Sequence, residues 1–196
     1  MKNKNFLKFF SVIIFVIILT GIGYLMLNFP GIKKNFFYDR GKNLAIFQQE
    51  SEKTKSEPNR IEIPALGISG KVTYKVKKLE ENKTLSKSVI HLDGTALPGE
   101  EGNAVLTGHS SSLGWSYYDS IFAALNKLGN GDEVYVYRNN EKFIYSIIEK
   151  RIVSSDDVSV LSQGSGEKLT LITCWPLGTD FRRLIVTAES RDSDHN

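Results

Sequence analysis

The chain has 196 residues, with 25 Lys and Arg against 22 Asp and Glu and a formal net charge of +3 at neutral pH. This length suits one domain plus an extension, because domains most often have about 100 to 150 residues. The small net charge, with no Lys/Arg stripe that includes aromatic residues, argues against nucleic acid as a partner. The single cysteine cannot form an internal disulfide, so its thiol is a candidate reactive group.

The N-terminal segment, residues 1–28, predicts a short cytoplasmic tail and a single-pass transmembrane anchor. No charged residue lies between Phe9 and Leu27, and this length is close to the about 20 apolar residues that cross a bilayer. A cleaved signal peptide shares the basic start, but the apolar core is longer than usual and no small-x-small cleavage site follows it. Basic residues flank both ends of the segment, so the positive-inside rule does not fix its direction. A short basic tail before a long domain favours export of that domain.

Residues 29–59 are expected to join the anchor to the domain. Residues 48–59 contain no aliphatic or aromatic side chain, so burial cannot offset their ordering entropy and they predict a flexible tether. Residues 33–47 carry enough Phe, Leu and Ile to form a helix or to lie on the membrane surface. Residues 192–196 predict a disordered tail.

Residues 60–191 predict a mostly β domain, because short alternating apolar runs are separated by Gly, Asn and Pro. Turn residues support this, with a hairpin expected at Arg138-Asn-Asn-Glu141. The expected strands are 61–63, 72–76, 104–107, 133–138, 143–153, 169–173 and 184–188.

Residues 118–128 predict a single short helix laid on this β domain, capped by Asp119 or Ser120 and ended at Gly129. Its apolar residues recur at helical spacing: Ile121, Phe122, Leu125 and Leu128.

Cys174 ends an apolar alternating run and is followed by Trp175-Pro176. A thiol on the last residue of a strand is fixed in position and open to solvent on one side, as a nucleophile requires. The structural alternative is that free cysteine is usually buried as a small hydrophobe. Thiol chemistry needs the thiolate, whose fraction rises beside a cation or an imidazolium.

His109 and the pair Arg182-Arg183 are the candidate partners of this thiol. His109 ends another apolar run and can act as general base or imidazolium partner, provided that the two strands adjoin. Arginine adds a permanent charge and a donor fork for a carbonyl or an oxyanion. Only one of the two arginines can face the cysteine, because neighbours on a strand point to opposite faces. His91 is expected to be structural, since no reactive partner is assigned to it.

These residues lie in motifs that resemble the sortase family of cysteine transpeptidases. The motifs occur in the family's order and the resemblance covers about residues 60–189. It implies a closed eight-stranded β-barrel with one or two short helices, an N-terminal signal anchor in the cell membrane, and an extracellular catalytic domain. The sortase subclass stays undecided. The motifs are Thr107-Gly-His109, Leu171-Ile-Thr-Cys174 and Arg183-Leu-Ile-Val186.

The resemblance also implies a reaction. Cys174 cleaves an LPXTG-like sorting motif of a surface protein between Thr and Gly, and an amine from a cell-wall precursor or a pilin lysine resolves the thioester. By the matching positions, His109 is the acid/base and Arg183 stabilises the oxyanion, with Arg182 as the minority candidate. No cofactor is implied, and no acidic cluster for calcium or another metal is evident. The expected substrate-binding residues are Thr107, Gly108, Thr173, Trp175 and Arg182.

Two alternatives remain open from the residues. L,D-transpeptidases also use cysteine and histidine on a β fold, but their cysteine lies in a Ser-His-Gly-Cys type segment, unlike Ile172-Thr-Cys174-Trp. A membrane-anchored binding barrel without turnover is the second alternative. Loss of His109, Cys174 or the arginine would favour it, and all of them are present.

Overall fold

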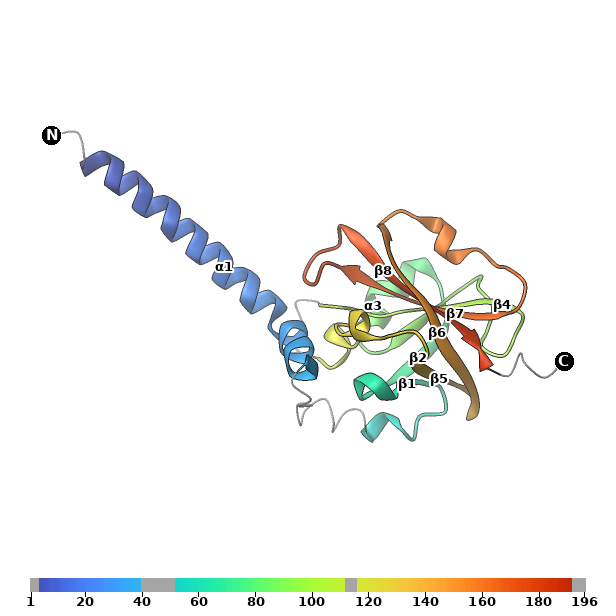
Figure 1. Cartoon of the computed structure of the whole chain (residues 1–196). Coiled ribbons are helices and arrows are strands. Elements are labelled where there is room, and N and C mark those ends of the chain that lie inside the picture. Colours follow the sequence, from blue (N-terminus) through green and yellow to red (C-terminus); the bar gives the residue numbers. More distant parts are fainter. Residues whose placement is uncertain (1–3, 40–51, 112–115, 192–196) are drawn as a thin grey trace.

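The computed structural model describes residues 4–39, 52–111 and 116–191, and shows a long helix projecting from a closed β-barrel (Figure 1). Eight strands close the barrel in the order β1-β2-β3-β4-β7-β8-β6-β5. The β2–β3 and β4–β7 pairs are parallel, and the other neighbours are antiparallel. The strands are β1 (Arg60–Ile63), β2 (Ile68–Val76), β3 (Val89–Leu92), β4 (Gly102–Thr107), β5 (Glu133–Arg138), β6 (Glu141–Ser154), β7 (Glu167–Trp175) and β8 (Arg182–Ser190).

The expected closed eight-stranded barrel is confirmed, and every expected strand is present. The sequence missed β3, because its four residues Val-Ile-His-Leu are nearly all buried and show no alternation. The expected hairpin joins β5 and β6, and Asn139 and Asn140 at its tip have φ values of 52° and 69°. Asparagine tolerates this left-handed region better than most residues, which explains its use at both positions.

The strands separate two apolar clusters on the two faces of the sheet. Leu169 and Leu171 of β7 belong to the interior cluster, whereas Ile172 belongs to a smaller cluster outside the barrel. This alternation follows from the two-residue period of a strand. Even-numbered residues of β7, including Cys174, therefore face outward.

The prediction of a single short helix over residues 118–128 is wrong. The segment contains two 3-10 turns, η3 (Tyr118–Ser120) and η4 (Leu125–Lys127), and no continuous α-helix. The Phe122 N–H donates to the His109 carbonyl at 2.9 Å, so it is not available to a carbonyl of its own segment. The apolar residues are nonetheless fully buried as expected: Ile121, Phe122, Leu125 and Leu128.

Four other short helical elements lie in the connections of the barrel. They are η1 (Pro64–Leu66), η2 (Lys78–Glu80), α3 (Glu81–Leu85) and η5 (Val158–Leu161).

The N-terminal helix α1 (Lys4–Asp39) contains the one described segment that is long and apolar enough to cross a membrane, Lys8–Leu25, with mean hydropathy 2.2. The Tyr24 hydroxyl donates to the Leu177 carbonyl at 2.9 Å, in the loop that follows β7. The last turn of the apolar segment of α1 therefore lies beside the loop that follows β7.

The described parts of the segment between anchor and barrel, residues 29–39 and 52–59, are more ordered than the composition predicts. Residues 29–39 continue α1, and Thr54 is only 6% exposed because its hydroxyl donates to the Ser69 carbonyl at 2.7 Å. The last part of the expected tether therefore packs on β2. Residues 40–51, which hold the end of the expected helical or membrane-surface stretch and the start of the expected tether, lie outside the described residues, as does the tail at 192–196.

His91 is fully buried in the barrel, as a structural histidine should be. Its Nδ1 accepts the Lys75 N–H at 3.3 Å and its Nε2 lies 2.8 Å from the Ala96 carbonyl, to which it donates. These partners require the neutral ring with a proton on Nε2. Burial accordingly lowers the pKa of His91 below its ordinary value.

We expect acid to weaken the fold through His91. The unfolded chain takes up the proton near about pH 6.5 and the folded chain only at lower pH. The free energy of unfolding should therefore fall as the pH is lowered below about 6.5, as measured by urea denaturation of the whole chain in nonionic detergent. His91→Gln should reduce stability at neutral pH and flatten this dependence. An equally steep loss in that variant would contradict the assignment.

Candidate active site

The register of β7 and β8 decides which arginine faces the cysteine. Cys174 lies directly opposite Arg183, and Trp175 lies opposite Arg182. Directly opposite residues of an antiparallel pair project from the same face of the sheet. Arg183 therefore shares the outer face with Cys174, and Arg182 belongs to the other face.

His109 reaches the same face through the parallel pair β4–β7. The last residues paired on these strands are Thr107 and Ile172. Beyond them the Gly108 N–H donates to the Ile172 carbonyl at 3.2 Å, and the Thr173 hydroxyl donates to the Gly108 carbonyl at 2.8 Å. Continuing this register by two residues places His109 beside Cys174. Three strands thus bring the histidine, the thiol and the guanidinium into one lateral row.

The backbone around His109 is held from two sides. The Phe122 N–H binds the His109 carbonyl, and the Phe122 ring packs against Gly108. A Cβ at Gly108 would lie 2.8 Å from that ring, so glycine is needed for the close approach. The histidine is therefore fixed relative to β7 by packing as well as by hydrogen bonds.

Burial and charge act in opposite directions on the two titratable groups of the row. Burial raises the pKa of the Cys174 thiol, the Arg183 guanidinium opposes this, and the Asp180 carboxylate adds to it. Burial lowers the pKa of His109, and the Asp119 carboxylate opposes this. Burial therefore favours a neutral thiol and a neutral imidazole, whereas Arg183 and Asp119 favour the thiolate and the imidazolium.

The Arg183 side chain is oriented by the loop before β8. Its Nη1 donates to the Asp180 carbonyl at 2.9 Å and to the Arg182 carbonyl at 3.0 Å. A guanidinium has five N–H donors, and those on its other nitrogens make no hydrogen bond to a described residue. They are available to an oxygen placed near the thiol.

Two acidic residues of this site were not assigned a role there from the sequence. Asp119 was interpreted only as a helix cap, yet it is 5% exposed and its charge acts on His109, while its Oδ2 accepts the Ser116 N–H at 2.7 Å. Asp180 acts on Cys174 from the loop between β7 and β8. Only the folding of these loops brings the carboxylates near the row, so no local motif identifies them. Among the described residues, no group of three His, Cys, Asp or Glu is placed to hold a metal ion.

The expected substrate-binding residues fall on different parts of the barrel. Thr107 is half-buried and shares the outer face with His109. Gly108 and Thr173 are buried and bind each other, so they join β4 to β7. Trp175 packs against the interior cluster, and Arg182 is exposed.

An apolar surface adjoins the row on the outer face. Ile172 lies opposite Ile185, two residue pairs along β7 and β8 from the pair Cys174–Arg183 and on the same face. Val160 of η5 packs over them. A cavity of about 240 Å³ continues from this surface and is lined in part by Val160, Ile185 and Thr170. The apolar surface therefore lies between the row and this cavity on the outer face.

Comparison with known proteins decides the family. The sequence profile of the sortase domain matches residues 61–191, which is more than half of the chain. The chain belongs to the sortase family. It is a cysteine transpeptidase, so the L,D-transpeptidase and the binding barrel without turnover are set aside.

The relatives of this sortase come from several bacteria. Sortase D of Bacillus subtilis is 30% identical over 152 residues, which are 76% of this chain and 69% of that protein. The structure of sortase C-1 from Actinomyces oris shares 30% identity, with a TM-score of 0.59 over 76% of this chain and 82% of that one. Clostridium perfringens sortase C, solved with the C-terminal cell wall sorting motif, shares 26% identity, with a TM-score of 0.61 over 87% of this chain and 90% of that one.

Arg183 and Asp180 carry charges of opposite sign beside the thiol, so removing one or the other should shift the pKa of Cys174 in opposite directions. Asp180→Asn should lower the pKa of Cys174 and Arg183→Gln should raise it, because each removes one of the named charges. The measurement is the rate of Cys174 alkylation by iodoacetamide across pH, followed by mass spectrometry of the intact chain. Arg182→Gln, on the other face, should leave the profile in place. Shifts of the same sign in the Asp180 and Arg183 variants would refute this electrostatic account.

Proposed function

We propose that this sortase is a membrane-anchored transpeptidase that cleaves an LPXTG-like sorting motif between Thr and Gly through a Cys174 thioester. The acyl group then passes to an amine, which attaches a surface protein covalently or polymerises it. The observation that carries the proposal is the lateral row, in which Cys174 lies between His109 and Arg183. The row supplies a nucleophile, a proton carrier and a fixed cation on one face.

Each member of the row has one chemical role. His109 takes the thiol proton, and the Cys174 sulfur attacks the carbonyl carbon of the motif's Thr. The guanidinium N–H groups of Arg183 stabilise the oxyanion that develops. His109 then gives its proton to the leaving Gly amine, and the C–N bond breaks to leave a thioester. In the second half an amine gives a proton to His109 and its nitrogen attacks the thioester carbon. The new amide bond forms as the C–S bond breaks, and His109 returns the proton to the sulfur.

The substrate's apolar residues are proposed to lie along the outer face next to the row. The surface formed by Ile172 and Ile185 leads directly to the thiol and suits the Leu and Pro of such a motif. The Clostridium perfringens structure with a sorting motif supports this kind of substrate for the fold. Of the other expected contacts, Thr107 is proposed to bind the substrate directly. Gly108 and Thr173 are proposed to act by holding the strands in place.

The proposed location is the cell membrane, with the barrel on the extracellular side. Helix α1 has the length and hydropathy of a single-pass anchor, and its Tyr24 contacts the loop after Cys174. This arrangement supports an enzyme that meets membrane-tethered surface proteins and a cell-wall precursor or pilin amine at the membrane surface. Cleavage of the helix as a signal peptide would release the barrel and contradict the anchor.

The first test uses the whole chain in nonionic detergent, an LPXTG peptide library and a small amine. Mass spectrometry should show cleavage between Thr and Gly and capture of the acyl group by the amine. Cys174→Ala should abolish both products, and His109→Ala should reduce the rate by about 10²–10⁴-fold, the usual contribution of acid–base catalysis. Cleavage that persists in Cys174→Ala would rule out the thioester route.

The second test compares the two arginines. Arg183→Ala should lower kcat/KM by about 10²–10³-fold, as removal of an oxyanion donor does, and Arg182→Ala should have a much smaller effect. Circular dichroism of both variants checks that the barrel remains folded. Equal losses, or a larger loss at Arg182, would overturn the role given to Arg183.

A further inference from the structure

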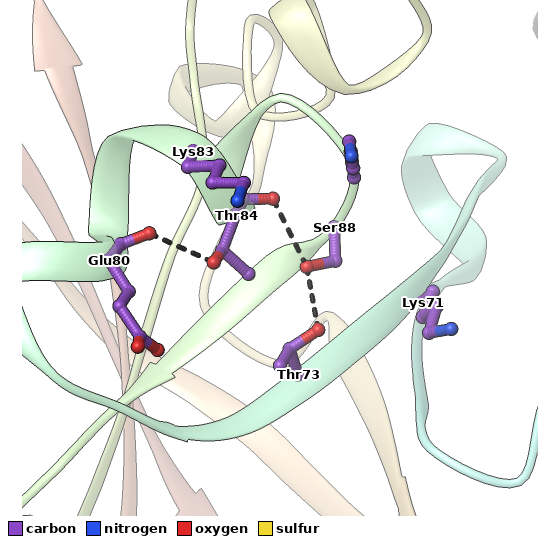
Figure 2. Close-up of a pocket in the computed structure, with 7 residues that line it drawn as sticks. Lys71, Thr73, Glu80, Lys83, Thr84 and Ser88 are labelled. Atoms are coloured by element: carbon purple, nitrogen blue, oxygen red, sulfur yellow. Dashed lines mark hydrogen bonds between the residues drawn. The ribbon is translucent and has the colours of Figure 1, made fainter.

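A second cavity, outside the lateral row, lies between β2, the η2–α3 segment and the start of β3. It has a volume of about 410 Å³. Figure 2 shows that its walls come from β2 on one side and from the helical segment on the other. Its lining residues are Lys71, Thr73, Glu80, Lys83, Thr84, Lys87 and Ser88.

The lining of this lysine cavity carries an excess of positive charge, with three lysines against the single carboxylate of Glu80. Lys71 is paired with Glu57 only weakly, since its Nζ lies 3.9 Å from the carboxylate and both side chains are about half exposed. Lys83 and Lys87 form no salt bridge with a described residue. Two ammonium groups at the mouth therefore lack a countercharge from the described part of the chain.

The hydroxyl groups of the cavity are fixed by a chain of hydrogen bonds (Figure 2). The Thr84 hydroxyl donates to the Glu80 carbonyl at 2.9 Å, and the Ser88 hydroxyl donates to the Thr84 carbonyl at 3.3 Å. The Thr73 hydroxyl lies 2.8 Å from that of Ser88, to which it donates. Each hydroxyl has one proton, and all of them are used within the wall. Donors for a ligand must therefore come from the lysine ammonium groups, so the wall selects an anion.

The lysine cavity continues the lateral row of the active site. The parallel pairs Val72–Val89 and Thr73–Ile90 place Lys71 beside Ser88 when the register is extended by one residue. The antiparallel pair Ile90–Thr107 places Ser88 beside His109 when its register is extended by two residues. The row across β2, β3, β4, β7 and β8 is then Lys71, Ser88, His109, Cys174 and Arg183.

The distance along this row follows from the spacing of strands. Neighbouring strands lie about 4.8 Å apart, so three spacings place Lys71 about 14 Å from Cys174. The cavity is on the His109 side of the thiol, away from Arg183. In the proposed reaction the incoming amine gives its proton to His109, so the acceptor approaches on that same side.

We propose that the lysine cavity binds a phosphate group, carried as a phosphate ester by the amine acceptor. Lysine ammonium groups act as separate point charges and suit the several oxygens of a phosphate, whereas the paired donors of arginine suit a planar carboxylate. The assignment to the acceptor depends on the proposed function. The bilayer offers the same phosphate chemistry in its headgroups, and the test separates these two sources.

The phosphate itself is tested by binding, which needs no turnover. The whole chain in nonionic detergent is titrated calorimetrically with glycerol 3-phosphate at low salt. The double variant Lys83→Gln/Lys87→Gln should bind at least about tenfold more weakly. One lysine beside an anionic lipid surface contributes about fivefold in affinity, and two lysines are removed here. Lys142→Gln/Lys150→Gln removes the same charge from β6 and should bind as the unmodified chain does. Equal affinity of the cavity variant and the unmodified chain, or an equal loss in the β6 control, would overturn the proposal.

The source of the phosphate is tested with matched acceptors. The acceptor peptide triglycyl-phosphoserine is compared with triglycyl-serine. When extended, this tetrapeptide spans about 14 Å, the distance from the thiol to the lysine cavity. The KM of triglycyl-phosphoserine as acceptor should be several-fold lower, and the cavity variant should lose this difference. Hydrolysis of the sorting peptide without acceptor should stay unchanged, which separates this result from failure of the proposed function. Equal KM values would overturn the acceptor assignment; loss of glycerol 3-phosphate binding in phosphatidylglycerol nanodiscs would then assign the site to lipid headgroups.

Discussion

The pairing of β7 with a parallel strand on one side and an antiparallel strand on the other is the constraint on which the site depends. Cys174 is the penultimate residue of β7, and its neighbours in the row come from β4 and β8. Because the barrel is closed, each of these strands has both edges paired and its register is fixed. A shift of one residue would turn Arg183 to the opposite face. The chemistry of the site therefore rests on backbone hydrogen bonds far more than on contacts between its side chains.

In the row, burial and one nearby charge shift the pKa of the thiol, and likewise that of the imidazole, in opposite directions. The thiol and the imidazole both lose water contact, which favours their neutral forms, while one cation and one carboxylate act in the other direction. A site of this kind holds its nucleophile largely as the thiol until a substrate is positioned. A protected thiol suits an enzyme whose product is a transferred acyl group, because side reactions of a free thiolate are reduced.

Different groups lie on the two sides of the thiol on the outer face. Across the strands, Arg183 lies on one side of the thiol, and His109 and the lysine cavity lie on the other. The apolar surface of Ile172 and Ile185 lies further along the strands, next to the row. In the proposed reaction, an acyl donor on the apolar surface and an amine acceptor on the His109 side would reach the same sulfur from different directions. The contact between Tyr24 and the loop after β7 brings the membrane helix close to this face. The N-terminal helix, the apolar surface and the lysine cavity are consequently arranged around the end of β7.

Local sequence determined those features that depend on local periodicity and chemistry: seven of the eight strands, the Asn-Asn hairpin, the apolar N-terminal helix, and a thiol at a strand end before proline. It could not determine features that depend on partners distant in the chain. Phe122 donates to His109 and so breaks the expected helix, and Asp119 acts on the same histidine across a loop. The parity rule showed that only one arginine of the pair could serve the thiol. Only the tertiary register of β7 and β8 placed Arg183 opposite Cys174, because the facing of a strand residue is set by its neighbour strand and not by its own sequence.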